Sequence, residues 1–169
     1  MTGVQTCALP IFNRDPDGGY SWRIRSRNEW PSLPQFDEVV GHVVRFIGAL
    51  PELYGTDPKK VYLMGFSQGA ATSYAIAMRY PDLVMGIAGL VGFVPTECGD
   101  VLRMSPLRDL PIFMAVGRHD KRIPYGRSQS CAQSMYAAGA DLEYREYDTG
   151  HKLNAVGMRD LKEIGRAHV

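Results

Sequence analysis

Continuous apolar runs and stretches of helical character alternate along the chain. Three apolar runs, at residues 60–66, 83–93 and 110–117, are typical of strands that are buried on both faces of a parallel sheet. The run at 142–147 alternates polar and apolar residues, as an edge strand does. We expect helices at 35–54, 68–80, 125–138 and 154–163. Strands that alternate with helices predict an α/β fold with right-handed crossovers and a mostly parallel sheet flanked by helices.

Two segments show neither a helical nor a strand period. Residues 12–34 are rich in Gly, Pro, Arg and Asn and predict a long surface loop. Residues 96–109 are irregular and predict a surface loop beside a pocket. His42 lies among polar positions of the first predicted helix, and we assign no role to it.

The composition favours one soluble globular domain, because 45% of the residues are hydrophobic and the formal net charge is +1. No apolar run is long enough to cross a bilayer, so we expect no stable membrane insertion. Basic and acidic residues balance without a basic block, which argues against a nucleic-acid partner. The cysteines Cys7, Cys98 and Cys131 are too few and too scattered for a disulfide framework or a metal site. We expect buried, reduced thiols and a cytoplasmic location.

Both ends of the chain resemble translated sequencing adapter. When residues 164–169 (IGRAHV) are written in codons, the opposite strand, read in a shifted frame, encodes TCALPI, which is the sequence at residues 6–11. We therefore expect non-native tails at 1–11 and 164–169 and treat residues 12–163 as a partial domain.

The stretch Gly65-Phe66-Ser67-Gln68-Gly69 fits the pattern G-x-S-x-G between an expected strand and an expected helix. Glycines at both flanks would let the strand and the helix approach a strained turn that exposes the serine hydroxyl. An isolated pentapeptide of this kind is also compatible with a tight turn that has no chemistry. The strand before it and the helix after it favour a nucleophile.

A nucleophilic serine needs a base and a carboxylate that orients the base. Asp120 follows a buried strand, where catalytic groups gather in open α/β sheets, and His151 lies in a loop after the edge strand. The order Ser67, Asp120, His151 is the one that nucleophile-elbow enzymes require. His119 suits the role less well because adjacent side chains point apart, and Asp148 is expected to bond turn amides.

Several motifs together resemble the phospholipase/carboxylesterase family of α/β-hydrolases, relatives of acyl-protein thioesterases. They are GFSQG (65–69), GRHDKRIP (117–124) and GH (150–151), with GGYSW (18–22) and LVGFVP (90–95) in support. The resemblance covers essentially residues 14–162 and implies an α/β-hydrolase fold. It implies that Ser67 is the nucleophile, His151 the base and Asp120 its orienting partner. It also implies one oxyanion donor, the amide of Gln68, and an acyl pocket bordered by Trp22 and Phe93.

The chain departs from the family at one point. In the family, an earlier strand precedes an H-G-x-G type loop that supplies a second oxyanion amide, and the chain has no such segment before Phe12. We therefore expect the N-terminal strands of the sheet to be missing and apolar surface to be exposed along one sheet edge. We expect the 169-residue chain to be weakly active or inactive.

The residues and the resemblance predict a serine hydrolase that cleaves carboxylic esters through an acyl-enzyme, without metal or cofactor. Its substrate would be a small-molecule or lipid-like acyl ester, with thioesters and lysophospholipids as further candidates. One alternative is a peptidase-like hydrolase of the same fold, which amide turnover would distinguish from ester turnover. The other is a noncatalytic relative that acts as a binding module. The presence of all three triad residues argues against that second alternative.

Overall fold

The computed structural model describes residues 13–14, 20–22, 29–104 and 106–168. The first described elements are β1 (Asn13–Arg14), β2 (Tyr20–Ser21), the 3₁₀ helix η1 (Leu33–Phe36), α1 (Asp37–Tyr54), β3 (Tyr62–Phe66), α2 (Gln68–Arg79) and the 3₁₀ helix η2 (Pro81–Leu83). They are followed by β4 (Gly86–Leu90), α3 (Gly99–Arg103), β5 (Pro111–Gly117), α4 (Tyr125–Ala137), β6 (Asp141–Tyr147) and α5 (Ala155–His168). Strands β3 to β6 fall on the four predicted runs.

The main sheet is parallel throughout. Its strands lie in the order β3, β4, β5, β6. Phe66 pairs with Leu90, Leu90 with Ala115, and Gly117 with Tyr147, so the strands end side by side. The predicted α/β fold with a parallel sheet is therefore confirmed. β6 lies at an edge of the described sheet, as its alternating pattern predicted.

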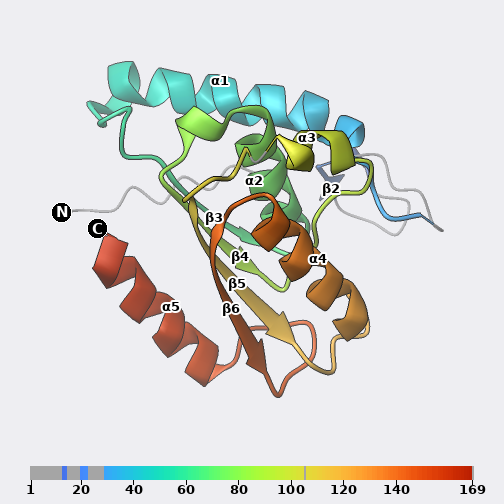
Figure 1. Ribbon diagram of the computed structural model, residues 1–169. Helices are drawn as coiled ribbons and strands as arrows, with labels where there is room; N and C mark the ends of the chain where they lie inside the picture. The colour runs from blue at the N-terminus through green and yellow to red at the C-terminus, as the bar shows by residue number, and fades with distance from the viewer. Residues whose placement is uncertain (1–12, 15–19, 23–28, 105, 169) are drawn as a thin grey trace.

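Helices lie on both faces of this sheet (Figure 1). α2 and α4 pack on one face, α1 packs against α2, and α5 lies on the opposite face against β5 and β6. The face under α2 and α4 forms the main hydrophobic core, which includes Tyr74, Met114 and Met135. Under α5 lies a smaller cluster around Phe113 and Ala115.

Small side chains let α2 approach the sheet closely. Four of its alanines are fully buried: Ala70, Ala71, Ala75 and Ala77. The large side chain among them is Tyr74, whose hydroxyl fits against the backbone of β4. A Cβ built on Gly89 would lie 1.7 Å from this hydroxyl oxygen, so the pairing of tyrosine and glycine is what makes the close packing possible.

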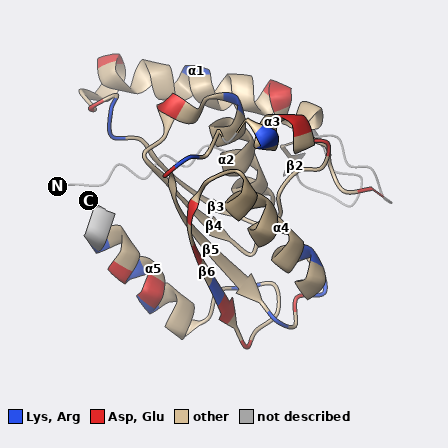
Figure 2. Cartoon of the chain, viewed as in Figure 1, with Lys and Arg blue, Asp and Glu red and all other residues tan. Residues whose placement is uncertain are grey.

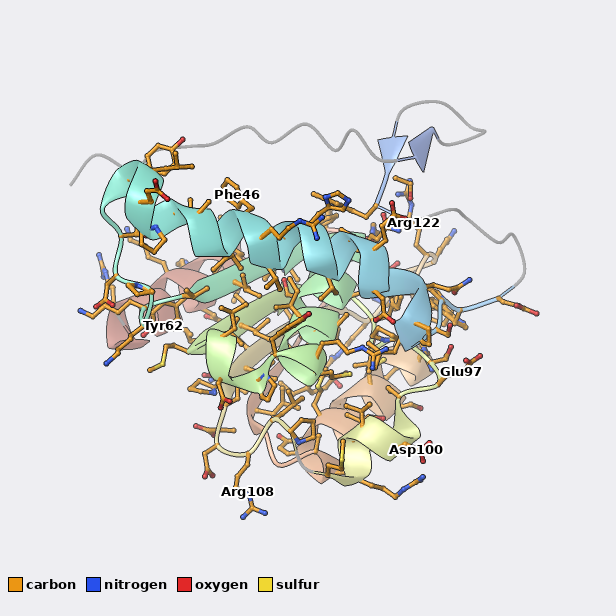
Figure 3. The ribbon with its side chains drawn as sticks, turned by 90° about the horizontal axis from the view of Figure 1, so that it is seen from above. Phe46, Tyr62, Glu97, Asp100, Arg108 and Arg122 are labelled. Carbon is orange, nitrogen blue, oxygen red and sulfur yellow. The ribbon has the colours of Figure 1, made fainter. Side chains whose placement is uncertain are left out.

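β3 is not buried on both faces, contrary to the prediction from its apolar run. Tyr62, Met64 and Phe66 are 43%, 69% and 48% exposed. They alternate with Leu63, which packs against the main core, so they lie on the opposite face of the strand. Among the described residues, no strand pairs with the outer side of β3, and Figure 3 places Tyr62 at the periphery of the molecule. These side chains lie on a face of β3, and the apolar surface expected along its edge stays a prediction.

The two segments predicted as irregular loops contain short elements. β1 and β2 form an antiparallel pair, η1 buries Leu33 and Phe36, and α3 occupies part of the segment 96–109. Contacts between distant residues hold these parts in place: the Leu33 N–H donates to the Thr96 carbonyl at 2.8 Å. The prediction was wrong there because such contacts leave no periodic pattern in the sequence.

The predicted C-terminal tail begins inside α5. This helix continues to His168, and Ile164 packs beside the smaller cluster. The predicted N-terminal tail, residues 1–11, lies outside the described residues. The division into a domain at 12–163 and two non-native tails stays a prediction.

In the described part of the chain, basic and acidic residues both occur along helices and loops (Figure 2). No helix in the described part of the chain is long and apolar enough to cross a membrane. Within the same residues, no group of three or more His, Cys, Asp and Glu side chains could hold a metal ion.

Candidate active site

Ser67 stands at a sharp turn between β3 and α2. Its backbone has φ 55° and ψ −113°, a strained conformation for a residue with a side chain. A Cβ built on Gly65 would lie 2.2 Å from the carbonyl carbon of Gly69, so only glycine allows the strand and the helix to approach this closely. A Cβ on Gly69 would meet no described atom within 4 Å. The predicted need for glycine at both flanks therefore holds for Gly65 alone.

Asp120 lies in a tight loop after β5, and its side chain is buried. Its Oδ1 accepts hydrogen bonds from the backbone N–H groups of Arg122 (2.8 Å) and Ile123 (3.0 Å). Its Oδ2 lies 2.7 Å from Nδ1 of His151. One oxygen thus fixes the carboxylate to the loop, and the other is held toward the imidazole.

His151 completes a chain of hydrogen bonds. Its Nε2 lies 2.9 Å from Oγ of Ser67. When Nδ1 carries the ring proton and donates it to Asp120, Nε2 is free to accept the serine hydroxyl proton. The ring of Phe66 contacts the imidazole edge-to-face, with centroids 5.2 Å apart. The structure therefore brings together the three predicted triad residues, which come from three separate loops.

The loops that carry Asp120 and His151 are packed directly on each other. A Cβ built on Gly117 would lie 2.2 Å from the carbonyl oxygen of Gly150, so a side chain there would push the two loops apart. Beside this contact, the His119 N–H donates to the Thr149 carbonyl at 2.9 Å. These backbone contacts hold the carboxylate and the imidazole within hydrogen-bonding distance.

His119 and Asp148 pair with each other outside this chain of hydrogen bonds. Nε2 of His119 lies 2.6 Å from Oδ1 of Asp148, and the two side chains are 70% and 84% exposed. Asp148 thus has a histidine partner in place of the predicted turn amides. The hydrogen bonds of Ser67 and His151 go to other partners, and an exposed pair of this kind contributes little to stability.

Cys98 and Cys131 are buried and free, as predicted. Burial raises the pKa of both thiols, so the reactive thiolate is disfavoured. The Val94 N–H donates to Sγ of Cys131 at 3.1 Å. Neither cysteine is therefore suited to be a nucleophile, and Cys7 lies outside the described residues.

Gln68 begins α2, directly after Ser67. Its N–H belongs to the first helical turn, whose donors have no partner within the helix, and the helix dipole favours negative charge at this end. Its side chain points elsewhere: Oε1 accepts hydrogen bonds from the Ser21 hydroxyl and the Trp22 N–H, both at 3.2 Å. The sequence predicted a role for the backbone amide only. The side-chain contact was missed because it joins residues far apart in the chain.

The two residues predicted to border an acyl pocket both pack near the core. Trp22 is half-buried against the main hydrophobic cluster, and Phe93 is buried. The Phe93 ring contacts that of Trp30 edge-to-face, with centroids 5.1 Å apart, and the Arg127 guanidinium lies 5.2 Å from the centroid of Trp30. Trp30 and Arg127 were not predicted as neighbours of Phe93. The acyl-pocket role of Trp22 and Phe93 stays a prediction.

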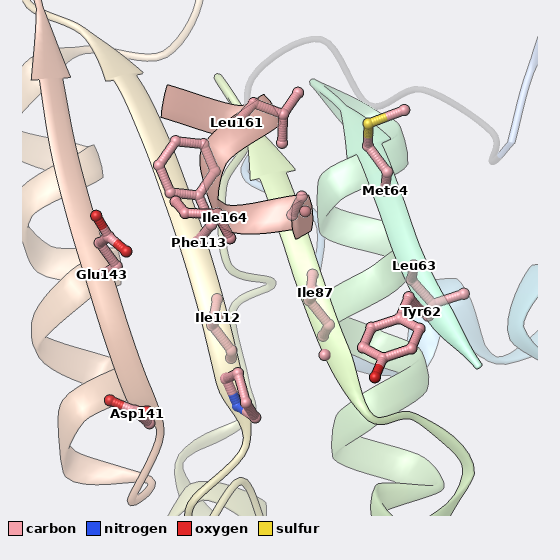
Figure 4. Close-up of a pocket in the computed structure, with 14 residues that line it drawn as sticks. Tyr62, Leu63, Met64, Ile87, Ile112, Phe113, Asp141, Glu143, Leu161 and Ile164 are labelled. Carbon is pink, nitrogen blue, oxygen red and sulfur yellow. The ribbon is translucent and has the colours of Figure 1, made fainter. Parts of the chain in front are cut away.

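A cavity of about 330 Å³ opens elsewhere, on the sheet face that α5 covers (Figure 4). Leu161 and Ile164 of α5 form one wall, and β3 contributes Tyr62 and Met64. The lining contains none of the triad residues. The cavity is therefore separate from the serine site.

The model of one protein family, phospholipase/carboxylesterase, matches residues 32–169. Among curated relatives, the carboxylesterase SOBER1 of Arabidopsis thaliana is 29% identical over 112 residues, which are 65% of this chain and 48% of that protein. Acyl-protein thioesterase 1 of Kluyveromyces lactis is 30% identical over 115 residues, 65% of this chain and 50% of that protein. The chain thus spans about half the length of these relatives.

Solved structures show the same architecture. The crystal structure of Arabidopsis thaliana SOBER1 matches with a TM-score of 0.76 and 22% identity, over 90% of this chain and 76% of that one. The crystal structure of esterase PE8 matches with a TM-score of 0.77 and 20% identity, over 89% and 71%. At these identities the likeness concerns the fold alone, and it confirms the predicted α/β-hydrolase fold.

Proposed function

Because this chain belongs to the phospholipase/carboxylesterase family, we propose that it is part of a serine hydrolase that cleaves carboxylic esters through an acyl-enzyme on Ser67. The observation that carries the proposal is the continuous chain of hydrogen bonds from Ser67 through His151 to the buried carboxylate of Asp120. Thioesters are included among the substrates because an acyl-protein thioesterase is one of the relatives. Lysophospholipids are a further candidate class.

In the first half of the reaction, Ser67 Oγ attacks the acyl carbon while Nε2 of His151 takes the hydroxyl proton. The imidazolium that forms is stabilised by Asp120 at Nδ1. The oxygen of the tetrahedral intermediate lies at the amino end of α2, where the Gln68 N–H donates to it. The imidazolium then gives its proton to the leaving alcohol or thiol, and the acyl group remains on Ser67.

In the second half, water replaces the leaving group. His151 takes a proton from the water as it attacks the acyl carbon, and Ser67 recovers its proton when the acid leaves. No residue changes its net protonation over the cycle, and no metal or cofactor is part of this scheme. Trp22 and Phe93 are proposed to border the acyl chain.

Two alternatives predict different outcomes. A peptidase-like hydrolase would turn over amides as well as esters. A binding module would need no proton transfer, and the close contact between His151 and Ser67 favours catalysis over it.

We also propose a cytoplasmic location, which the buried free thiols of Cys98 and Cys131 support.

The test is covalent labelling with a fluorophosphonate probe. We expect the probe to label the full-length protein at Ser67, and Ser67→Ala in that protein to abolish labelling and lower ester turnover by several powers of ten. Ser130→Ala is the matched control, because the Ser130 hydroxyl is exposed on α4 and donates only to the Gly126 carbonyl. Labelling that persists in Ser67→Ala would overturn the proposal.

A further inference from the structure

The side chain of Gln68 joins the serine turn to a segment 46 and 47 residues earlier in the chain. Both contacts converge on one atom: Oε1 lies 3.2 Å from the Ser21 hydroxyl and 3.2 Å from the Trp22 N–H. A backbone N–H can only donate, so the atom that faces it is the amide oxygen. One acceptor therefore holds a side chain and a main-chain group of the same segment.

The segment held in this way, Ser21–Trp22, is partly buried. Ser21 is buried and pairs with Asn13 in the β1–β2 ladder, and Trp22 packs against the main core. Gln68 directly follows Ser67 in the chain, so the backbone N–H of Trp22 is hydrogen-bonded to the residue next to the candidate nucleophile. A displacement of this backbone would move the indole relative to Ser67.

We propose that the Gln68 carboxamide is a positioning residue that fixes the Ser21–Trp22 segment beside the nucleophile and thereby sets the preference for acyl-chain length. The inference rests on the proposed ester hydrolysis. The backbone N–H of Gln68 serves the developing oxyanion, whereas its side chain serves the wall that the acyl chain meets. Experiments can distinguish the role of the Gln68 N–H from that of its side chain. A long and a short ester form the same oxyanion, but only the long acyl chain reaches far along the Ser21–Trp22 segment.

Two substitutions at Gln68 distinguish the amide oxygen from the side-chain volume. Gln68→Met keeps the length of the side chain but removes the acceptor, so both hydrogen bonds are lost. Gln68→Glu keeps an acceptor oxygen at the same reach, so both donors retain a partner. Its charge opposes the oxyanion and lowers the turnover of every ester. The ratio between two esters cancels that common effect.

The first measurement is the ratio of kcat/KM for p-nitrophenyl octanoate to that for p-nitrophenyl acetate. We expect Gln68→Met to lower this ratio about tenfold, through a higher KM for the octanoate, because two net hydrogen bonds are lost. Ser21→Ala removes one of the two bonds and should lower it less. Gln68→Glu should keep the ratio of the unchanged chain, and the exposed Ser130→Ala control should leave it unaltered.

The second measurement does not depend on catalysis. Amide hydrogen exchange of Trp22 should become faster in Gln68→Met and stay slow in Gln68→Glu, with circular dichroism showing that both variants are folded. An unchanged exchange rate of the Trp22 amide in Gln68→Met would show that the Gln68 carboxamide does not hold this N–H. Faster exchange with an unchanged ester ratio would overturn the role in chain-length preference. If the full-length protein with Gln68 unchanged neither reacts with fluorophosphonate nor hydrolyses either ester, the proposed function fails and the preference with it, while the exchange result still decides the positioning role.

Discussion

Replacing Asp120 by Asn tests the assignment of the carboxylate that holds His151. Oδ1 of Asp120 accepts two backbone N–H groups, from Arg122 and Ile123, so the oxygen of the new amide is required at that position. Its NH₂ group then faces Nδ1 of His151, at the place where Oδ2 lies 2.7 Å away. An NH₂ group donates, so Nδ1 must become the acceptor and the ring proton moves to Nε2. In that tautomer His151 no longer accepts the proton of Ser67.

The expected loss is about 10⁴-fold in turnover, the size known for the wrong tautomer in a triad, which corresponds to about 5 kcal/mol in the activation free energy. Asp148→Asn is the matched control. It makes the same chemical change at the exposed partner of His119, and the hydrogen bond between these two side chains lies outside the triad, so turnover should fall by less than about fivefold, as expected for the loss of a weak surface pair. Both variants are made in the full-length protein and assayed for kcat with p-nitrophenyl acetate at equal folded concentration. If Asp148→Asn caused the greater loss, the assignment of Asp120 would be wrong.

Other substitutions test the packing that supports the site. Tyr74→Phe removes a buried hydroxyl that has no hydrogen-bond partner among the described residues, so the free energy of unfolding in urea should rise by about 1 kcal/mol; a fall would mean that the hydroxyl is satisfied. Gly65→Ala places a methyl group against the backbone of α2 and should lower the free energy of unfolding by at least about 2 kcal/mol; a neutral effect would contradict the close approach. We expect the exposed apolar side chains of β3 to promote self-association of the chain. Met64→Lys puts a charge on this face and should lower the self-association measured by light scattering, whereas an unchanged signal would show that β3 does not cause it. Cys131 should react with iodoacetamide only on unfolding, because burial raises its pKa; fast modification of the folded chain would contradict that placement.

The sequence predicted the four strands of the main sheet and the proximity of Ser67, Asp120 and His151. Both predictions follow from the order of apolar runs and polar residues along the chain. Apolar runs place strands, and groups that follow the carboxyl ends of parallel strands come to one edge of the sheet. The exposure of β3 was not visible in its apolar run, since burial depends on which elements cover a strand. A continuous apolar sequence fits a covered strand and an uncovered one equally well.

The sequence could not predict contacts that involve segments without a helical or strand period. Gln68 belongs to a recognisable motif, but its side chain binds Ser21 and Trp22, which lie in a stretch without helical or strand period. Likewise, the sequence did not predict the ring contact between Phe66, which ends β3, and His151. Such pairs are set by the three-dimensional path of loops, and a single sequence carries no signal for them.

The precision of the site follows from strand register more than from the loops that carry its residues. β5 and β6 pair from Pro111 with Asp141 through to Gly117 with Tyr147, and the loops to Asp120 and His151 begin directly after this last pair. A slip of one residue would turn alternate side chains to the other face and displace one loop along the other by about 3.3 Å. That displacement exceeds the whole 2.7 Å separation between Nδ1 and the carboxylate oxygen. The pairing of β5 with β6 in this one register therefore sets the triad geometry together with the fold, because a slip in either direction would separate the carboxylate from the imidazole.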